Sequence, residues 1–182
     1  MAEFALFAPR LLKWERGFSF DAVDSGGATK DGVTLRTFAA YCRKKHWPEP
    51  GIDQLLALTA LQWTEIMRDY WDRCRADNWR DQRLADFVVD WYINAGRPAI
   101  RALQWAAHVQ ADGIVGSKTL RAVNKAPSVK LLQTLLVARK AFYINLVRRR
   151  PDQRRFLRGW LNRTEDRSEE HTSELQSHYS IS

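Results

Sequence analysis

The sequence has few cysteines and no long apolar run. Only two of its 182 residues are cysteines, Cys42 and Cys74, and they lack the Cys-x-x-Cys spacing and nearby histidines of a zinc site. We therefore expect two buried free thiols rather than a metal centre. No apolar run approaches the ~20 residues of a membrane-spanning helix. The N-terminus also lacks a basic segment followed by a continuous apolar one, so no secretory signal is predicted.

Acidic side chains are also in the minority. The chain has 29 Lys and Arg against 21 Asp and Glu, a net charge of +8 at pH 7. This surplus implies an anionic partner, and nucleic acid, a membrane surface and the bacterial cell wall all qualify. Charge alone does not choose among the three.

The end of the sequence differs in kind from the rest. Residues 167–177 read Arg-Ser-Glu-Glu-His-Thr-Ser-Glu-Leu-Gln-Ser, which one reading frame of a common short-read sequencing adapter encodes, and Ile181 and Ser182 match the codons after its variable index. We interpret residues 167–182 as adapter read-through and exclude them from fold and function. Because this tail holds one arginine and three glutamates, the remaining 166 residues carry 28 basic and 18 acidic side chains, a net charge of +10.

Helix signals are dense and strand signals are few. A chain of this length fits one domain. Apolar periodicity predicts helices at residues 4–16, 35–46, 59–74, 81–95, 98–109, 117–124, 128–150 and 156–161. Glycines and aspartates break the helical period between Phe18 and Val33, which indicates an irregular loop or a short β-hairpin. The predicted fold is mainly α, with a small β-hairpin near the N-terminus.

Single residues predict several helix starts. Thr34, Ser117 and Ser128 each precede an apolar-periodic stretch as an N-cap would, and Thr59 has capping-box spacing to Gln62. Gly96 and Pro98 are typical of a helix end and of the next helix start. The last long helix has an apolar face that we expect to consist of Val129, Leu132, Leu135, Leu136, Phe142, Tyr143 and Leu146.

Residues 15–34 carry the densest chemistry of the chain. Glu15 ends an apolar helix, and Asp21 and Asp24 follow in a glycine-rich turn. A glycosidic bond is cleaved when one carboxylic acid protonates the leaving oxygen and a second carboxylate supports water or attacks the anomeric carbon. Partly apolar surroundings would raise the pKa of Glu15 and keep it protonated for acid catalysis. Asp24 fits the solvated second carboxylate, with Asp21 as the competitor.

Two threonines of the same segment offer hydroxyls that can hold a water. These are Thr29 and Thr34, although Thr34 fits a helix cap equally well. The alternative interpretation is structural. Glu15 is then a solvated charge at a helix end, and Asp21, Asp24 and Asp31 are ordinary turn residues. The residues alone weigh the two interpretations about equally.

The whole segment resembles the signature of the glycoside hydrolase 108 family of N-acetylmuramidases, approximately Glu-Gly-Gly-Tyr-x-Asn-Asp-Pro-x-Asp-x-Gly-Gly-x-Thr-x-x-Gly-Ile-Thr. The matching positions are Glu15, Gly17, Asp21, Asp24, Gly26, Gly27, Thr29, Gly32 and Thr34. By this resemblance Glu15 is the essential catalytic acid. The order of Glu15, Asp24 and Thr29 is also similar to that in phage-type lysozymes, which supports their roles by analogy. The fold expected with this resemblance is a lysozyme-like helical domain. Departures at Arg16, Phe18, Phe20 and Ala22 affect substrate contacts and loop rigidity.

A second resemblance spans residues 84–124, which look like the predicted peptidoglycan-binding region found beside that catalytic motif. Tyr92 and Asn94 are candidates for lining a cleft and binding substrate, although a tyrosine on an apolar helical face is most often part of the core. A connection between two helices carries Asp112, Gly113, Gly116 and Thr119, which suit turn and cap positions better than sugar binding. The expected organisation is a catalytic region at 1–80 and a peptidoglycan-binding-like region at 81–166, packed into one domain.

These observations predict a muramidase-type peptidoglycan hydrolase that cuts the β-1,4 bond between N-acetylmuramic acid and N-acetylglucosamine. Glu15 acts as general acid, Asp24 as second carboxylate, and Thr29 helps to hold water. Substrate contacts are assigned to Asp21, Thr34, Tyr92 and Asn94. No metal or organic cofactor is required, and a threonine-held water favours inversion because it needs the wider carboxylate spacing.

The expected setting is that of a monomeric phage or prophage endolysin. Such a protein is stored in the host cytoplasm and released through a separate membrane pore to the periplasm or cell wall. Its partner is bacterial peptidoglycan.

Two alternatives belong to other classes, a basic helical nucleic-acid-binding protein and a catalytically inactive wall-binding module. The late arginines are Arg148, Arg149, Arg150, Arg154, Arg155 and Arg158. They either complement a helix dipole or contact anionic envelope polymers and lipid head groups. A nucleic-acid partner is not expected, because it leaves the pattern of residues 15–34 unexplained.

Overall fold

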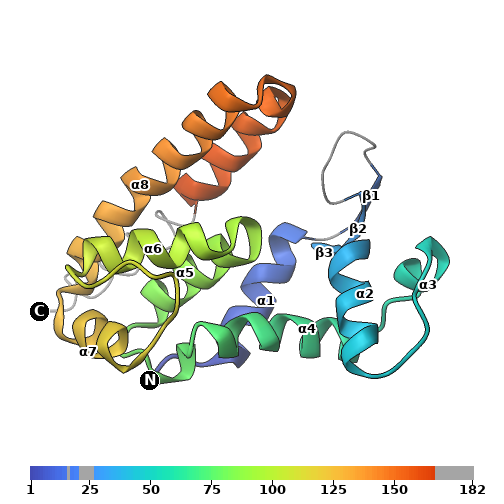
Figure 1. The fold of residues 1–182 in the computed structure, drawn as a ribbon, viewed down its shortest axis with the longest axis horizontal. Coiled ribbons are helices and arrows are strands. Elements are labelled where there is room, and N and C mark those ends of the chain that lie inside the picture. The colour runs from blue at the N-terminus through green and yellow to red at the C-terminus, as the bar shows by residue number, and fades with distance from the viewer. Residues whose placement is uncertain (16, 21–26, 167–182) are drawn as a thin grey trace, which may run out of the picture. The chain divides into compact units, whose positions relative to one another are not determined.

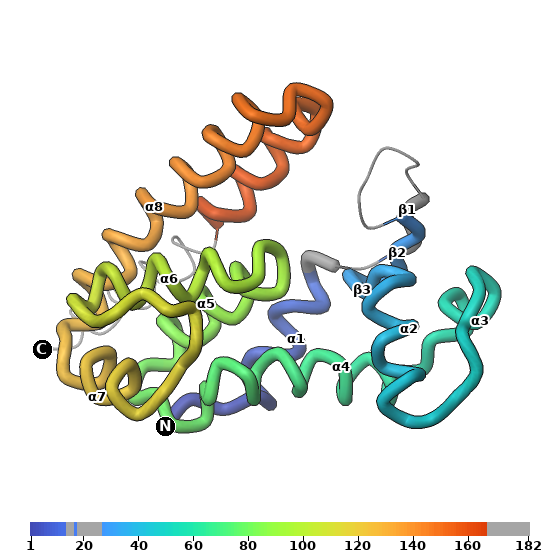
Figure 2. Tube along the Cα trace, viewed as in Figure 1, coloured from blue at the N-terminus to red at the C-terminus, as the bar shows by residue number. Residues whose placement is uncertain are grey.

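The computed structural model describes residues 1–15, 17–20 and 27–166, and this part of the chain is mainly helical. It forms two compact units. Phe4–Asp72 is the N-terminal unit, and Met1–Glu3 with the described residues from Arg73 onward is the C-terminal unit. Figures 1 and 2 trace the elements of each. None of the described helices is both long and apolar enough to cross a membrane.

The N-terminal unit contains one small sheet and four helices among its described residues. The elements are α1 (Phe4–Glu15), β1 (Phe18–Phe20), β2 (Ala28–Lys30), β3 (Val33–Thr34), α2 (Leu35–Lys44), α3 (Ile52–Leu56) and α4 (Ala60–Arg73), whose last residue begins the C-terminal unit. The strands pair antiparallel in the order β1-β2-β3. The hairpin expected from the sequence is therefore confirmed, with β3 as an added strand.

Local capping explains where two of these helices begin. The Thr34 hydroxyl accepts a hydrogen bond from the Thr37 N–H at 3.1 Å, which caps α2. At the start of α4 the Gln62 N–H donates to the Thr59 hydroxyl at 3.2 Å, and the Thr59 N–H donates to Gln62 Oε1 at 2.9 Å. Both caps were predicted, and the second is a complete capping box.

The core of the N-terminal unit forms where α1 meets α4. Phe7 and Leu11, one turn apart on α1, are fully buried, and so is Trp71 of α4. The ring centroids of Phe7 and Trp71 lie 5.2 Å apart, and Phe4 meets the same indole edge-on at 5.9 Å. Each such buried side chain contributes about 1.5–3 kcal/mol through removal of apolar surface from water. These contacts fix α1 and therefore its last residue, Glu15.

The C-terminal unit is helical in all of its regular described elements. They are η1 (Ala76–Asn78), α5 (Gln82–Ala95), α6 (Arg97–Ala106), α7 (Ser117–Lys125), α8 (Ser128–Arg149), η2 (Pro151–Phe156) and a final helix at residues 157–166. Asp81 caps α5 by accepting the Leu84 N–H at 3.1 Å. Gly96 ends α5 with φ 70°, a value that glycine adopts without strain. Pro98 stands in the first turn of α6, as predicted.

Two predicted serine caps are wrong. The N-cap of α7 is Gly116 and that of α8 is Pro127, so Ser117 and Ser128 are already the first helical residues. The Ser128 side chain instead hydrogen-bonds the carboxylate of Asp81. The Ser128 hydroxyl therefore bonds to Asp81, although the local sequence predicts that it caps α8.

Two further helix predictions need correction. α6 ends at Ala106 rather than Val109, whose N–H bonds back to the Gln104 carbonyl at 2.9 Å. The buried residues of α8 are Leu131, Leu135, Arg139 and Tyr143, a stripe of four-residue spacing. Leu135 and Tyr143 belong to the predicted face, whereas Leu131 and Arg139 do not. Val129 of that predicted face is 42% exposed.

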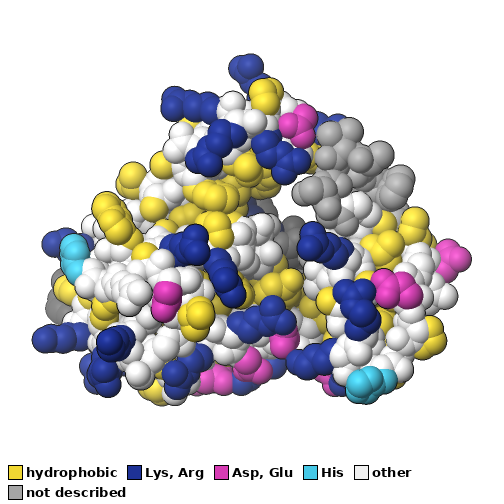
Figure 3. All heavy atoms as spheres, viewed as in Figure 1, with side chains coloured by type: hydrophobic (Ala, Val, Ile, Leu, Met, Phe, Trp, Pro, Cys, Tyr) yellow, Lys and Arg dark blue, Asp and Glu magenta, His cyan; other side chains and the backbone are white. Residues whose placement is uncertain are grey.

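Basic side chains gather on the surface of the C-terminal unit. Figure 3 shows Lys and Arg side chains over the end of α8 and the start of η2, at the top of the view. All six late arginines, for which the sequence left open a helix-dipole role or contact with anionic polymers, are exposed. Arg155 also lies over the Phe156 ring, 4.8 Å from its centroid. Contact of this cluster with an envelope polymer stays a prediction.

Candidate active site

The small sheet brings the predicted hydroxyls together. Thr29 on the central strand stands opposite Ser19 of β1 and opposite Thr34 of β3. Glu15 is the last residue of α1, and β1 begins three positions later at Phe18. The central strand therefore holds Thr29 beside the chain that leaves the end of α1.

Asp31 closes the base of the segment that we call the site loop, residues 17–31. Its carboxylate accepts the Gly17 N–H at 2.8 Å, and its own N–H donates to the Gly17 carbonyl at 2.8 Å. Its carbonyl accepts the Trp63 indole N–H at 2.9 Å, and its second carboxylate oxygen pairs with Lys30 at 3.1 Å. Asp31 makes these contacts in a left-handed conformation, φ 47°, which is uncommon for a residue other than glycine.

The sequence offered Asp31 only as an ordinary turn residue. Its partners Gly17 and Trp63 lie 14 and 32 positions away, so no local sequence pattern predicts these contacts. Gly17, at φ 115°, takes a conformation that strongly favours glycine. A glycine and a strained aspartate thus hold together the two ends of the loop that contains Asp21, Asp24 and Thr29.

The two threonine hydroxyls differ in how firmly they are engaged. The half-buried Thr29 hydroxyl donates to the Gly27 carbonyl at 3.4 Å, at the weak end of hydrogen bonding. The Thr34 hydroxyl accepts the Thr37 N–H and donates to the Thr37 hydroxyl at 3.0 Å. Thr29 therefore keeps more capacity for a water, whereas Thr34 is a helix cap whose contact with substrate stays a prediction.

Asp21 and Asp24, the two candidates for the second carboxylate, lie outside the described residues. Glu15 is placed by its backbone as the end of α1. The chemical roles of all three stay predictions.

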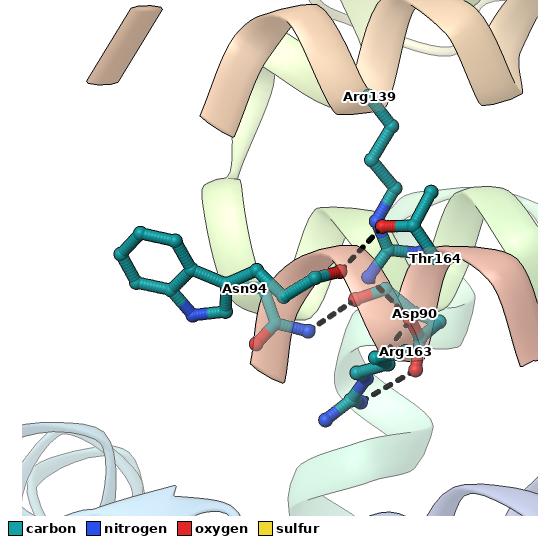
Figure 4. A network of polar contacts seen from close by, with 6 residues as sticks. Asp90, Asn94, Arg139, Arg163 and Thr164 are labelled. Atoms are coloured by element: carbon teal, nitrogen blue, oxygen red, sulfur yellow. Dashed lines mark hydrogen bonds and ion pairs between the residues drawn. The ribbon is translucent and has the colours of Figure 1, made fainter. Parts of the chain in front are cut away.

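Tyr92 and Asn94, predicted to contact substrate, lie on α5 in the C-terminal unit. The Asn94 side-chain amide donates to the Asp90 carbonyl at 2.8 Å. Figure 4 shows this amide beside a cluster in which the Asp90 carboxylate accepts from Arg139 of α8 at 2.8 Å and from Arg163 of the final helix at 2.5 Å. Asp90 and Arg139 are fully buried. The structure therefore places Asn94 next to an architectural ion network, and its contact with sugar stays a prediction.

Gln104, which the sequence analysis did not single out, organises the connection between α6 and α7. Its side-chain amide donates to the Asp112 carboxylate at 2.7 Å, the Ile114 carbonyl at 2.9 Å and the Thr119 hydroxyl at 3.1 Å. The side-chain carbonyl oxygen of Gln104 accepts the Gly113 N–H at 2.8 Å. The bond from Gln104, with one from the Ile114 N–H, holds the pKa of Asp112 below its ordinary value. Asp112, Gly113 and Thr119 are thus engaged in the turn, as expected.

A cavity of about 340 Å³ also lies in the C-terminal unit. Its lining residues are Trp79, Arg80, Asp81, Leu84, Val123, Asn124, Ala126, Pro127 and Ser128. Its polar side chains are already engaged. Asp81 caps α5, and the Asn124 amide accepts the Arg80 N–H at 2.9 Å and donates to the Asn78 carbonyl at 2.8 Å. The cavity is accordingly a structural feature of the junction before α8.

The cysteines are buried free thiols, as predicted. Burial raises the pKa of the Cys74 thiol, which makes it a poor nucleophile and a poor ligand. Within the described ranges, no three His, Cys, Asp or Glu side chains gather closely enough to hold a metal ion.

Comparisons with known proteins agree with this geometry. The family model described as glycosyl hydrolase 108 matches residues 8–96, and one described as a predicted peptidoglycan domain matches residues 98–165. The solved structure of Brucella abortus SagA is 30% identical, covers 91% of this chain and 92% of its own, and superposes with a TM-score of 0.78. No curated protein matches significantly.

These matches refine the sequence analysis. The first match contains the site loop and continues through α5, so Tyr92 and Asn94 fall within its range rather than within the peptidoglycan match. The mainly helical, lysozyme-like fold with a small sheet near the N-terminus is confirmed. The two models together indicate a glycoside hydrolase that acts on peptidoglycan. This chain belongs to glycosyl hydrolase family 108.

Proposed function

We propose that the protein is an N-acetylmuramidase that cleaves the β-1,4 bond between N-acetylmuramic acid and N-acetylglucosamine, with Glu15 as the general acid. The observation that carries this proposal is the position of Glu15. It ends a helix anchored in the core through Phe7 and Leu11, and the chain then enters the strand that pairs with the Thr29 strand. A general acid needs such a fixed backbone because its proton must reach one oxygen of the substrate.

The reaction needs one further carboxylate and a water. Glu15 donates its proton to the glycosidic oxygen as the bond from that oxygen to the anomeric carbon breaks. Asp24, with Asp21 as the alternative, accepts a proton from the water whose oxygen attacks the same carbon from the opposite face. Thr29 supports this water because its hydroxyl has only a long bond to Gly27. The product then has inverted configuration.

Product analysis tests the bond that is cut. Purified sacculi are digested, the new reducing ends are converted to alditols with borohydride, and the fragments are identified by mass spectrometry. We expect the alditol of N-acetylmuramic acid. The alditol of N-acetylglucosamine would identify a glucosaminidase and overturn the assignment. Proton NMR of the first product then reports the anomer, with α for inversion and β for retention.

We propose an endolysin as the biological role. The same chain is expressed in bacterial cytoplasm with and without a co-expressed membrane pore. Lysis that requires the pore supports storage in the cytoplasm before release to the wall. Lysis without a pore would show that the protein has its own export route.

A further inference from the structure

A stripe of exposed side chains runs along α6. Arg97, Arg101 and Trp105 are spaced four residues apart, so they share one face of the helix. Trp105 is 74% exposed. Tryptophan is highly buried on average in folded proteins, so an indole this open on a well-packed helix indicates a surface for contact.

The connection between α6 and α7 lies alongside this stripe. Ile114 at its tip is 60% exposed. A Cβ added to Gly113 would lie 3.2 Å from the Arg97 Cβ and 3.4 Å from the Arg101 Nε, so the turn backbone runs directly against both arginines. The bonds from Gln104 fix this turn. Ile114 is therefore presented on a rigid support.

The two arginines of the stripe are exposed and have no ion-pair or hydrogen-bond partner in the part of the chain that the structure describes. Asp112 feels the positive charge of Arg101, but its carboxylate is occupied by Gln104 and by the Ile114 N–H. Two like charges one turn apart repel each other. An external anion would relieve this repulsion.

We propose that Trp105, Arg101, Arg97 and Ile114 form a binding surface for the peptidoglycan strand, which we call the α6 surface. The apolar face of a sugar ring packs on the indole and on Ile114. The guanidinium groups pair with carboxylates of the muramyl lactyl groups or stem peptides. An open stripe suits a polymer that extends past it, and Arg101, Trp105 and Ile114 lie within the peptidoglycan match at residues 98–165, which begins one residue after Arg97. This proposal rests on the proposed function only for the identity of the bound polymer, peptidoglycan.

A sedimentation experiment with the full chain tests this surface. Protein is mixed with purified sacculi on ice, and the bound fraction is measured against protein concentration. We expect Trp105→Ala to raise the dissociation constant about tenfold, as truncation of a tryptophan anchor commonly does. Joint replacement of Arg97 and Arg101 by glutamine should weaken binding by about as much, less so at high salt. Sacculi whose carboxylates have been amidated should bind the parent as weakly as untreated sacculi bind that double variant.

Matched controls come from the same unit. Val137 of α8 is 68% exposed and Arg121 of α7 is exposed, so Val137→Ala and Arg121→Gln remove an exposed apolar group and an exposed cation elsewhere. We expect both to bind sacculi like the parent, with unchanged melting temperatures for all variants. Equal weakening by the controls, or parental binding by Trp105→Ala, would overturn the α6 surface. A Trp105-dependent loss seen only with DNA or anionic vesicles would overturn it as well.

The two proposals can be refuted independently, because sedimentation measures binding and reducing ends measure hydrolysis. Trp105-dependent sedimentation without release of reducing ends would retain the α6 surface and reject the proposed muramidase. Release of N-acetylmuramic acid reducing ends without Trp105-dependent sedimentation would retain the proposed muramidase and reject the α6 surface.

Discussion

The N-terminal unit has ion pairs at turns and on helix surfaces, whereas the C-terminal unit also has Asp90 paired with two arginines in its core. In the first, Lys30 and Asp31 pair at the base of the site loop with about a quarter of each side chain exposed. In the second, Asp90 and Arg139 are fully buried, Arg163 is nearly so, and the Phe87 and Tyr143 rings flank the Arg139 guanidinium. The same charge chemistry shapes a loop in one unit and joins three helices in the other.

This difference predicts different sensitivities. A buried charge that loses its partner cannot be solvated, so neutralising Asp90 removes the carboxylate that pairs with the fully buried Arg139 guanidinium. Surface charges keep their water, so their removal costs little stability. Loss of a charged side chain in the N-terminal unit should therefore mainly lower activity. Loss of the core charge in the C-terminal unit should mainly lower the free energy of unfolding.

The largest expected effect is the loss of stability in Asp90→Asn. We expect the free energy of unfolding to fall by about 3–5 kcal/mol, the usual cost of breaking a buried pair. The matched change is Glu49→Gln in the N-terminal unit, where Glu49 pairs with Arg43 at 3.3 Å and both are exposed, and it should cost at most about 1 kcal/mol. Urea denaturation measures both. Similar losses in the two variants would erase the contrast between the units.

The next effect is the loss of activity when the base of the site loop opens. Asp31→Gly removes the carboxylate while relieving the left-handed strain, and we expect kcat to fall about tenfold to a hundredfold through misplacement of catalytic groups. Asp31→Asn should retain most activity, because its amide oxygen can still accept the Gly17 N–H and asparagine tolerates positive φ. Initial rates on sacculi give the comparison.

His46→Gly is the control for the backbone. His46 is exposed and has φ 58° in the same unit, but it lies outside the site loop. Its replacement should leave kcat unchanged. A parental kcat in Asp31→Gly would show that the contacts with Gly17 do not position the site.

The smallest effect compares the two helix caps. Thr34→Ala and Asp81→Ala should each cost about 1 kcal/mol at pH 7. Burial raises the pKa of Asp81, but hydrogen bonds from Arg83, Ser128 and the Leu84 N–H outweigh it and hold the pKa below its ordinary value. The folded pKa thus lies below the unfolded one, so the ionised group contributes stability above about pH 4 and loses it as pH falls through the folded value.

The cost of Asp81→Ala should accordingly shrink between pH 7 and about pH 3, whereas the cost of Thr34→Ala should not. Urea midpoints at the two pH values measure both. Equal shrinkage of the two costs would contradict the assigned shift. Thr34→Ser keeps the cap, so a loss of activity in Thr34→Ser would point to contact of the Thr34 side chain with substrate.

Much of the fold follows from local sequence because its signals are local. The box formed by Thr59 and Gln62 and the glycine after α5 each act within a few residues, and their predicted boundaries are confirmed. Helix α3 was missed because five residues after a proline-rich turn show too little periodicity. Arg139 lies in the buried stripe of α8 because its guanidinium pairs with the carboxylate of Asp90, 49 positions earlier.

The candidate site was predictable in part for the same reason. A dense motif marks Glu15, Asp24 and Thr29, and the sheet indeed pairs the Thr29 strand with the chain after α1. Asp31 closes the loop through its bonds to Gly17, and its carbonyl accepts the indole N–H of Trp63 from α4. Contacts between residues this far apart follow no periodic pattern or fixed spacing in the sequence, so the sequence does not predict them.

Glu15→Gln tests the central claim most directly. New reducing ends from sacculi are measured for the parent, for Glu15→Gln and for Glu65→Gln, an exposed glutamate of α4 in the same unit that bonds to Tyr41 and Lys45. We predict a loss of about a hundredfold or more for Glu15→Gln, the usual contribution of a general acid, and parental activity for Glu65→Gln. Undiminished cleavage by a folded Glu15→Gln protein would contradict the account.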